Sequence, residues 1–264
     1  MGVLDLFSLK GNVALVTGGT HGLGMAVATA LAEAGATLVV NGHSPARLDA
    51  AIKEYKEKGI DAKGYLFDVT DEREVADAVA RIEREAGPVD ILVNNAGIIK
   101  RIQALDMTIA EWNDVITTDL TAPFLMSRAV AGGMIRRGHG KIINMCSMMS
   151  EVGRNSVTAY AAAKGGLKML TKNLATEWGS RNIQVNGIGP GYFATEQTAP
   201  IRVNGNPFND FIVGRTPAKR WGDPEDLGGT AVFLASRASD FVNGHILYVD
   251  GGILASLGRA ANEE

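Results

Sequence analysis

The sequence has very little cysteine, since Cys146 is the only one among 264 residues. A single thiol rules out an internal disulfide, which suits a protein of a reducing compartment such as the cytoplasm. The start of the chain has no basic region followed by an apolar stretch, and no run approaches the roughly 20 apolar residues that span a bilayer. We therefore expect a cytoplasmic protein without a signal peptide and without a membrane as partner.

An excess of charge of one sign is also lacking. Lys and Arg number 26 against 29 Asp and Glu, so the formal net charge is −3. This balance gives no support for nucleic acid or an anionic membrane as a partner, and we expect a small molecule instead. The hydrophobic share of 46% is ordinary for a globular protein with a sizeable core.

Short apolar runs alternate with longer amphipathic stretches along almost the whole chain. Most runs are rich in Val and Ile and bounded by Gly, Asn or Asp, which is typical of strands buried on both faces. The expected strands are Val13–Thr17, Thr37–Asn41, Ala62–Phe67, Ile91–Asn94, Lys141–Met145, Ile183–Ile188 and Ile246–Val249. The expected helices include Gly22–Ala34, Arg47–Lys58, Glu72–Ala86, Ile109–Arg137 and Ala159–Trp178.

This alternation predicts parallel strands joined by right-handed crossovers. The predicted fold class is α/β: a doubly wound, mostly parallel seven-stranded sheet with helices on both faces (Rossmann-like). No linker is evident, so residues 1–264 are expected to form a single domain. The segment from about 191 to 226 is rich in Pro, Gly, Asn and aromatics, and we expect it to be a substrate lid. Ser256–Glu264 is expected to be a tail.

The first expected strand runs directly into a glycine-rich turn and a helix. Gly18 can make the sharp turn out of the strand, Gly22 lets the backbone approach a pyrophosphate, and Gly24 lets the helix pack closely on the sheet. The helix would offer free N–H groups and its positive dipole end to the phosphates. The turn therefore predicts a dinucleotide site.

Three later residues fit proton-transfer chemistry. Tyr160 and Lys164 have the i, i+4 spacing, so they share one face of the expected helix. Ser147 stands at the end of an expected strand. A free tyrosine is a weak acid with a pKa near 10, and an ammonium neighbour is an effective way to make such a group a usable acid or base.

Together these segments resemble the short-chain dehydrogenase/reductase family. The matching elements are, in order, Gly18, Gly22 and Gly24, then Asn94–Gly97, Ser147, Tyr160 with Lys164, and Pro190-Gly191. The resemblance implies an NAD(P)-dependent enzyme in which Tyr160 is the general acid/base. It also implies that Ser147 binds the substrate oxygen and that Lys164 binds the nicotinamide ribose.

The resemblance further implies contacts along the cofactor. Asp68 and Val69 would lie beside the adenine, Asn95 and Gly97 on the ribose side, and Thr195 at the carboxamide. With the choices given next, the expected cofactor-binding residues are Gly18, Thr20, His21, Gly22, Leu23, Gly24, His43, Ser44, Arg47, Asp68, Val69, Asn95, Ala96, Gly97, Tyr160, Lys164, Pro190, Gly191, Phe193 and Thr195.

The end of the second expected strand bears on the choice of cofactor. An acidic residue normally binds the ribose 2′-hydroxyl of NAD there, and this sequence has none. His43, Ser44 and Arg47 are potential donors to a 2′-phosphate, and His21 lies in the glycine-rich turn. We therefore expect NADP as the preferred cofactor, with NAD as the alternative. Ser44 could equally serve only as the N-cap of the next helix.

A departure from the family pattern lies in the long central helix. The family has an asparagine there that completes a proton relay, and Asp119 stands at that place. Since Pro123 has no N–H, the carbonyl of Asp119 is free to hold a water that connects Lys164 to solvent. We predict a relay through this carbonyl, which makes Asp119 a catalytic candidate. The alternative is a kinked helix with a solvated aspartate. No metal ligands are assigned.

Cations near the catalytic residues predict an anionic substrate. Lys100 and Arg101 follow the Asn94–Gly97 segment, and Arg154 lies between the catalytic serine and tyrosine. Arginine suits a carboxylate, although Lys100 and Arg101 could equally belong to a solvated loop. Glu151 and Gln197 could bind hydroxyls. The candidate substrate-binding residues are Arg101, Ser147, Arg154, Tyr160 and Tyr192.

Within the family, the chain is most similar to the gluconate 5-dehydrogenases, through the segments 94–101, 141–154, 159–164, 187–195 and 241–252. This implies hydride transfer between NAD(P) and a sugar acid, D-gluconate or 5-keto-D-gluconate. The alternatives are a 2-dehydro-3-deoxy-gluconate 5-dehydrogenase and a 3-oxoacyl-carrier-protein reductase. A nucleotide-binding regulator without catalysis represents a different class. The resemblance also implies a homotetramer, while a homodimer is physically as easy to form.

Overall fold

The computed structural model describes residues 2–258, so of the expected tail only residues 256–258 fall within it. Seven strands form one sheet in the order β3-β2-β1-β4-β5-β6-β7, and every neighbouring pair is parallel. The strands are β1 (Val13–Val16), β2 (Thr37–Gly42), β3 (Ala62–Leu66), β4 (Val89–Asn94), β5 (Gly140–Met145), β6 (Ile183–Pro190) and β7 (Ile246–Val249). The predicted fold class is confirmed, and the sheet is wholly rather than mostly parallel.

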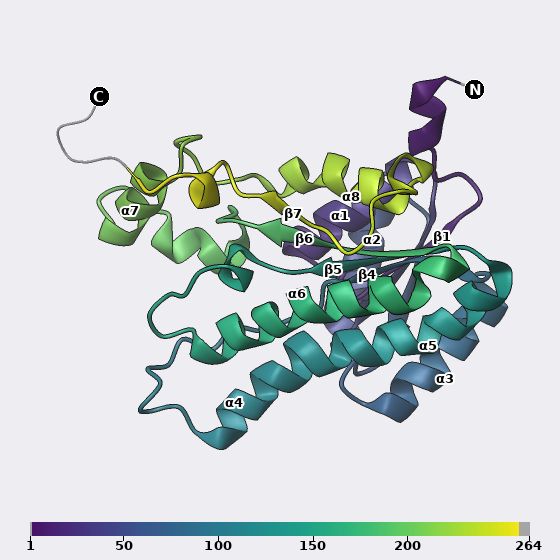
Figure 1. Cartoon of the computed structure of the whole chain (residues 1–264), viewed down its shortest axis with the longest axis horizontal. Helices are drawn as coiled ribbons and strands as arrows, with labels where there is room; N and C mark the ends of the chain where they lie inside the picture. Colours follow the sequence, from purple (N-terminus) through teal and green to yellow (C-terminus); the bar gives the residue numbers. More distant parts are fainter. Residues whose placement is uncertain (1, 259–264) are drawn as a thin grey trace.

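Eight α-helices accompany the sheet in the described residues 2–258. They are α1 (Gly22–Glu33), α2 (Pro45–Glu57), α3 (Glu72–Glu85), α4 (Ile109–Ile116), α5 (Ala122–Arg137), α6 (Thr158–Trp178), α7 (Pro207–Arg215) and α8 (Gly228–Ala235). Figure 1 shows α1 and α8 above the sheet and α3, α5 and α6 below it. No helix among these residues is long and apolar enough to cross a membrane.

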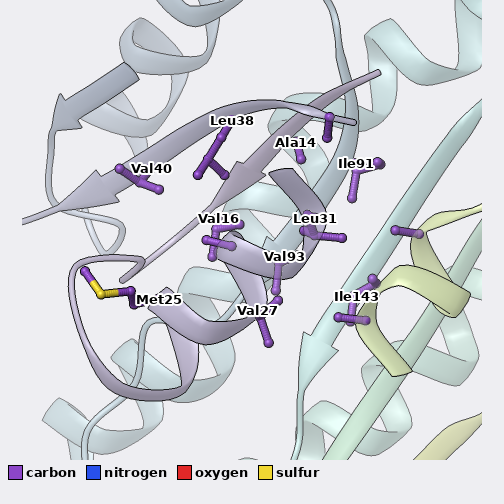
Figure 2. Packing of buried hydrophobic residues seen from close by; sticks show 14 of the residues in the cluster. Ala14, Val16, Met25, Val27, Leu31, Leu38, Val40, Ile91, Val93 and Ile143 are labelled. Carbon is purple, nitrogen blue, oxygen red and sulfur yellow. The ribbon is translucent and has the colours of Figure 1, made fainter. Parts of the chain in front are cut away.

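Side chains point alternately to the two faces of the sheet along each strand, so each face has its own hydrophobic core. In β1, Ala14 and Val16 point into the cluster shared with α1, α2 and α8, whereas Val13 and Leu15 join the cluster shared with α3, α5 and α6. Figure 2 shows the first cluster, where side chains of β1, β2 and β4 surround Leu31 of α1. Each fully buried Leu or Val contributes roughly 1.5–3 kcal/mol relative to an exposed one.

Burial on both faces holds for the central strands but not for the edge. Every residue of β1, β4, β5 and β6 is buried, as expected. In β3, Lys63, Gly64 and Leu66 are exposed, because this strand has a neighbour on one side only. The expectation of strands buried on both faces was therefore wrong for β3.

The long helix expected at 109–137 is broken by a π-helical segment at Thr117–Thr121. The N–H of Ala122 donates to the carbonyl of Thr117, five residues back, and Pro123 has no N–H to continue the regular pattern. The extra residue in this turn brings Asp119 to the inner side of the helix, where it is fully buried.

The segment 191–226 is more regular than expected, since it contains α7. Asn206 caps this helix by accepting a hydrogen bond from the N–H of Phe208 at 3.0 Å, and Pro207 occupies the first turn. Figure 1 shows α7 beyond one end of the sheet. It follows β6, so it lies at the edge where the strands have their carboxyl ends.

Candidate active site

A cavity of about 1180 Å³ lies at the carboxyl edge of the sheet. Its walls come from the segments that follow the first six strands, including the glycine-rich turn, Ser147 and the start of the 191–226 segment. Ligands of open parallel sheets bind at this edge. The volume exceeds that of an ordinary small-molecule pocket, about 300–1,000 Å³, and leaves room for a dinucleotide with a second small molecule.

The glycine-rich turn after β1 is shaped by two glycines with left-handed backbone. Gly18 and Gly22 have φ angles of 61° and 56°, which other residues rarely adopt. Gly24 is needed for space instead, because an added Cβ would lie 2.3 Å from Nδ2 of Asn95 and 2.4 Å from the carbonyl oxygen of Gly18. The roles predicted for Gly18 and Gly24 therefore have a direct geometric basis.

Side chains from other segments hold the backbone of this turn. Nδ2 of Asn95 donates to the carbonyls of Thr17 and Gly18, both at 3.0 Å, and Oδ1 of Asn41 accepts from the N–H of Gly18 at 3.3 Å. The hydroxyl of Tyr55 donates to the carbonyl of Gly19 at 2.7 Å. The amide of Asn95 thus shapes the wall of the cavity, a role that sequence reasoning did not foresee.

These walls fit a dinucleotide. Within the described chain no side chain caps the N-terminus of α1, which opens on the cavity, so its N–H groups remain available to a phosphate. An added Cβ at Gly22 would have Cγ2 of Thr195 as its nearest neighbour, at 3.8 Å, so the turn faces the segment after β6 across a narrow opening. Ser44 occupies the N-cap position of α2, yet its side chain makes no capping hydrogen bond.

Ser147 and Tyr160 both line the cavity, while Lys164 lies behind them. The hydroxyl of Ser147 accepts a hydrogen bond from the N–H of Met149 at 3.1 Å, which fixes its position at the end of β5. Nζ of Lys164 is 5.5 Å from the centre of the Tyr160 ring. The expected trio is therefore brought to one place, with the ammonium on the protein side of the tyrosine.

Lys164 and Asp119 form a fully buried ion pair. Nζ of Lys164 lies 3.1 Å from Oδ2 of Asp119 and donates to the carbonyl of Met145 at 2.8 Å. Burial by itself would lower the pKa of Lys164, but attraction from Asp119, and from Tyr160 and Cys146 when ionised, outweighs it and raises that pKa above its ordinary value. The lysine therefore keeps its positive charge at neutral pH.

Asp119 also orders the start of the loop after β4. Its Oδ1 accepts a hydrogen bond from the N–H of Ile98 at 2.7 Å, and a Cβ added to Gly97 would come within 3.0 Å of its Oδ2. The alternative of a solvated aspartate is wrong, because no part of the residue is exposed. The contact with Lys164 is made by the side chain of Asp119, and the relay through its backbone carbonyl stays a prediction.

Two arginines project into the other end of the cavity. Arg101 and Arg154 lie on loops that are joined by a parallel bridge between Ile102 and Val157. Arg154 is half-buried and forms no ion pair with any carboxylate of residues 2–258. Lys100 points elsewhere and pairs with Asp114 on α4, as expected of a residue on a solvated loop. A cation without an acidic partner in a cavity favours an anionic ligand.

Glu151 does not face the cavity, so its expected role in binding hydroxyls was wrong. Its carboxylate accepts hydrogen bonds from Nζ of Lys168 and from the hydroxyl of Tyr248, both at 2.6 Å. These two donors hold the pKa of Glu151 below its usual range. Gln197, in contrast, lines the cavity.

Burial raises the pKa of the Cys146 thiol to about 11, so this group stays protonated at neutral pH.

Comparison with known proteins agrees with this geometry. A family model described as enoyl-(acyl carrier protein) reductase matches residues 18–254. The chain belongs to the short-chain dehydrogenase/reductase family. It is thus an NAD(P)-dependent oxidoreductase that acts on a CH–OH group, and the family resemblance found in the sequence is confirmed.

Three members of the short-chain dehydrogenase/reductase family are especially similar. A 2-dehydro-3-deoxy-D-gluconate 5-dehydrogenase from Formosa agariphila is 64% identical over 262 residues, with 99% of each chain covered. A gluconate 5-dehydrogenase from Gluconobacter oxydans is 50% identical, over 96% of this chain and 98% of that one. The crystal structure of a gluconate 5-dehydrogenase from Burkholderia cenocepacia, in complex with NADP and tartrate, is 42% identical, with a TM-score of 0.92 over 97% of this chain and 100% of that one.

Most of the expected site residues lie on the cavity wall. Those found there are Gly18, Thr20, His21, Gly22, Leu23, Gly24, His43, Asp68, Val69, Asn95, Ala96, Gly97, Arg101, Ser147, Arg154, Tyr160, Gly191, Tyr192, Phe193 and Thr195. Ser44, Arg47, Asp119, Lys164 and Pro190 are not part of the wall. The sequence reasoning missed Asn41, Met148 and Met149, which do line it, and nothing in their residue types could have singled them out.

Proposed function

We propose that this enzyme interconverts a secondary alcohol and a ketone at C5 of a six-carbon sugar acid. The observation that carries the proposal is the position of Arg154, a half-buried cation with no acidic partner among residues 2–258, on the same cavity as Ser147 and Tyr160. A carboxylate bound there would present a distant hydroxyl to the catalytic tyrosine. Such a substrate has its charge and its reacting carbon at opposite ends.

Two sugar acids are candidates. The 64% identity with a 2-dehydro-3-deoxy-D-gluconate 5-dehydrogenase favours that compound. The 50% identity with a gluconate 5-dehydrogenase, and the similarity to a solved one, support D-gluconate with 5-keto-D-gluconate. Both carry a carboxylate and a hydroxyl at C5, so the same residues would serve either.

In this proposal the chain's own residues hold the substrate and move one proton. Ser147 donates a hydrogen bond to the reacting oxygen, and in oxidation Tyr160 takes the hydroxyl proton. Lys164 keeps its positive charge beside Tyr160 because Asp119 pairs with it. The nicotinamide ring supplies the hydride acceptor in oxidation and the hydride donor in reduction. The chain forms a single domain, and its 191–226 segment acts as a lid over the reacting groups.

NADP is the proposed cofactor. The end of β2 carries no carboxylate that would repel a 2′-phosphate, and His43 lines the cavity at that point. His21, at the N-terminus of α1, lines it as well. Arg47 and Ser44 follow at the start of α2, where Ser44 has no capping hydrogen bond to give up. The bound NADP in the Burkholderia enzyme supports the same choice.

We also propose that the enzyme is a cytoplasmic homo-oligomer, a tetramer or a dimer. Large apolar side chains lie exposed on α5, on α6 and after α8, at Phe124, Met169 and Phe241. A second copy of the chain would remove these side chains from water. Light scattering of the purified protein measures this directly, and a monomer at micromolar concentration contradicts it.

Initial rates of cofactor reduction test the function. D-Gluconate and 2-dehydro-3-deoxy-D-gluconate are each supplied with NADP⁺ and with NAD⁺. Turnover of either acid supports the sugar-acid proposal, and the larger kcat/KM identifies the substrate. Faster turnover with NADP⁺ supports the phosphate site near His43. No turnover of either acid, in protein shown to bind cofactor, refutes the proposal and leaves another substrate, such as a carrier-protein-linked ketone.

A further inference from the structure

Three aromatic side chains pack together in the 191–226 segment. The ring of Tyr192 meets the rings of Phe208 and Trp221 edge to face, with centroids 5.8 Å and 5.6 Å apart. Nε1 of Trp221 donates to Oδ1 of Asn209 at 2.9 Å, which ties the cluster to α7. Such edge-to-face pairs hold their rings in defined orientations. Tyr192 lines the cavity, whereas Phe208 stands outside its wall.

Arg154 rests against this cluster. Its guanidinium carbon lies 4.2 Å from the centre of the Phe208 ring, and its Nη1 donates to the hydroxyl of Tyr192 at 3.3 Å. Stacking uses the flat face of a guanidinium and leaves the N–H groups in its plane free. Only one of the five N–H donors of Arg154 has a hydrogen-bond partner among residues 2–258, so the others are available to a ligand in the cavity.

We propose that Phe208 is a positioning residue for a carboxylate-bearing substrate. Its ring fixes the plane of Arg154 so that the free edge of the guanidinium can bind the carboxylate with two parallel hydrogen bonds. Since Phe208 belongs to α7 and Arg154 to the loop after β5, a bound carboxylate also favours the arrangement in which α7 closes on the site. This inference rests on the proposed sugar-acid function.

The test compares Phe208→Leu with Phe211→Leu. Phe211 lies on the same helix and is 57% exposed, and its ring touches Phe208 but not Arg154. Kinetics are measured with whichever sugar acid the wild type turns over, and with D-glucitol, in which CH₂OH replaces the carboxylate of gluconate. We expect Phe208→Leu to raise KM for the acid roughly three- to thirty-fold with kcat little changed. Phe211→Leu should leave both constants near their wild-type values.

Two further variants separate positioning from a general effect on folding. Phe208→Tyr keeps a ring under the guanidinium, so its KM for the acid should stay close to the wild-type value. Adding Phe208→Leu to Arg154→Met should raise KM no further than Arg154→Met alone, because the ring acts only through the arginine.

The outcomes are distinct. If the wild type turns over neither acid, the proposed function is refuted, whereas the role of Phe208 is not. An unchanged KM in Phe208→Leu overturns the inference while the function stands. The inference is also overturned if Phe208→Leu raises KM for D-glucitol as much as KM for the acid. The same holds if the two substitutions raise KM additively in the double variant, or if Phe211→Leu raises KM as much as Phe208→Leu does.

Discussion

The glycine-rich turn lines the cavity, whereas helix α7 lies outside its wall and packs against Tyr192, and the two are held in place by different means. Around the turn, side chains such as Asn95 and Tyr55 bond to its backbone, and an added Cβ at Gly24 would meet atoms at 2.3 Å. Helix α7 is held by its cap Asn206 and by packing of side chains such as the fully buried Ile212, and its Gly214 has nothing within 4 Å of an added Cβ. The turn is tightly packed at Gly24, whereas α7 has open space beside Gly214.

This difference corresponds to two parts of ligand recognition, the binding of the cofactor and the binding of the substrate. A cofactor is bound through backbone N–H groups whose positions depend on steric fit, so almost any change there is costly. In the proposed function the substrate instead meets side chains on the cavity wall, such as Arg154 and Tyr192, which can be exchanged one at a time. The family can therefore keep one cofactor site and vary its substrates, and the five changes below test this division.

The largest effect is expected at Tyr160, where the two parts meet. Tyr160→Phe removes the proton acceptor and should lower kcat by about 1,000-fold, within the range of general acid–base catalysis. Cofactor affinity, measured by fluorescence titration, should change only a few-fold, because the glycine-rich turn is untouched. A variant that keeps more than a tenth of wild-type kcat would exclude Tyr160 as the acid/base.

Gly24→Ala should come next, because it inserts a methyl group into the filled turn. The clash with the carbonyl of Gly18 cannot be relieved by a side-chain rotation, and we expect a cost of roughly 3 kcal/mol in stability. Thermal unfolding should show a Tm several degrees lower, and cofactor Kd should rise at least tenfold. Wild-type values for both quantities would show that the turn is looser than its contacts indicate.

Asp119→Asn tests the buried pair with Lys164. The amide oxygen can still accept from the N–H of Ile98, but the NH₂ group then replaces the carboxylate oxygen that faces the ammonium of Lys164, and we expect a cost of about 3 kcal/mol at neutral pH. Since the pKa of Lys164 is raised in the folded protein, this stabilisation is fully present below the ordinary lysine pKa of about 10.4 and is lost as the pH rises through the folded value.

The measurement is the difference in Tm between wild type and Asp119→Asn across a pH series. It should be constant from neutral pH to about pH 10 and shrink above that. A difference that shrinks as the pH falls from 8 to 6 would contradict a charged lysine as its source. Ser127→Ala is a suitable control, because Ser127 is equally buried but bonds to Asn94 rather than to a charged group.

Tyr192→Phe is expected to have a small effect that is confined to the substrate. It removes one long hydrogen bond to Arg154 and keeps the packing on Phe208 and Trp221. KM for the sugar acid should rise about two- to five-fold, as for a single weak hydrogen bond, while cofactor Kd stays unchanged. A change in cofactor Kd of similar size would break the division between the two parts.

How far the sequence predicts this molecule follows the same division. The strands and the glycine-rich turn could be predicted, because they depend on local periodicity and on backbone requirements of consecutive residues. The trio Ser147, Tyr160 and Lys164 could be predicted from the spacing of its members and from the family resemblance. The strand ends differ from prediction by two residues or fewer, as at β4, which begins at Val89 rather than Ile91. The sequence drew attention to Asp119, and its role in a proton relay stays a prediction. The ion pair between its side chain and Lys164 depends on the π-helical turn, which no local pattern indicates.

Contacts between distant side chains could not be predicted. Glu151 lies near Ser147 in the sequence, yet Lys168 and Tyr248 turn its carboxylate away from the cavity. Phe208 on α7 and Arg154 on the loop after β5 are in contact, and the relative position of these two segments depends on the whole fold. The Asn206-Pro207 pair was the one local signal for helix α7, as an N-cap followed by a first-turn proline.

Gly214→Ala should have the smallest effect and the opposite sign to Gly24→Ala. Gly214 lies within α7 with helical backbone, and an added Cβ meets nothing within 4 Å. Alanine is favoured over glycine in a helix by up to about 1 kcal/mol, so α7 should become more stable, with a Tm equal to or slightly above that of the wild type. If closure of α7 requires bending at this glycine, kcat should fall while KM for the sugar acid falls with it. If α7 moves as a rigid helix, both constants should stay at wild-type values, and the space around α7 then serves substrate entry rather than helix bending.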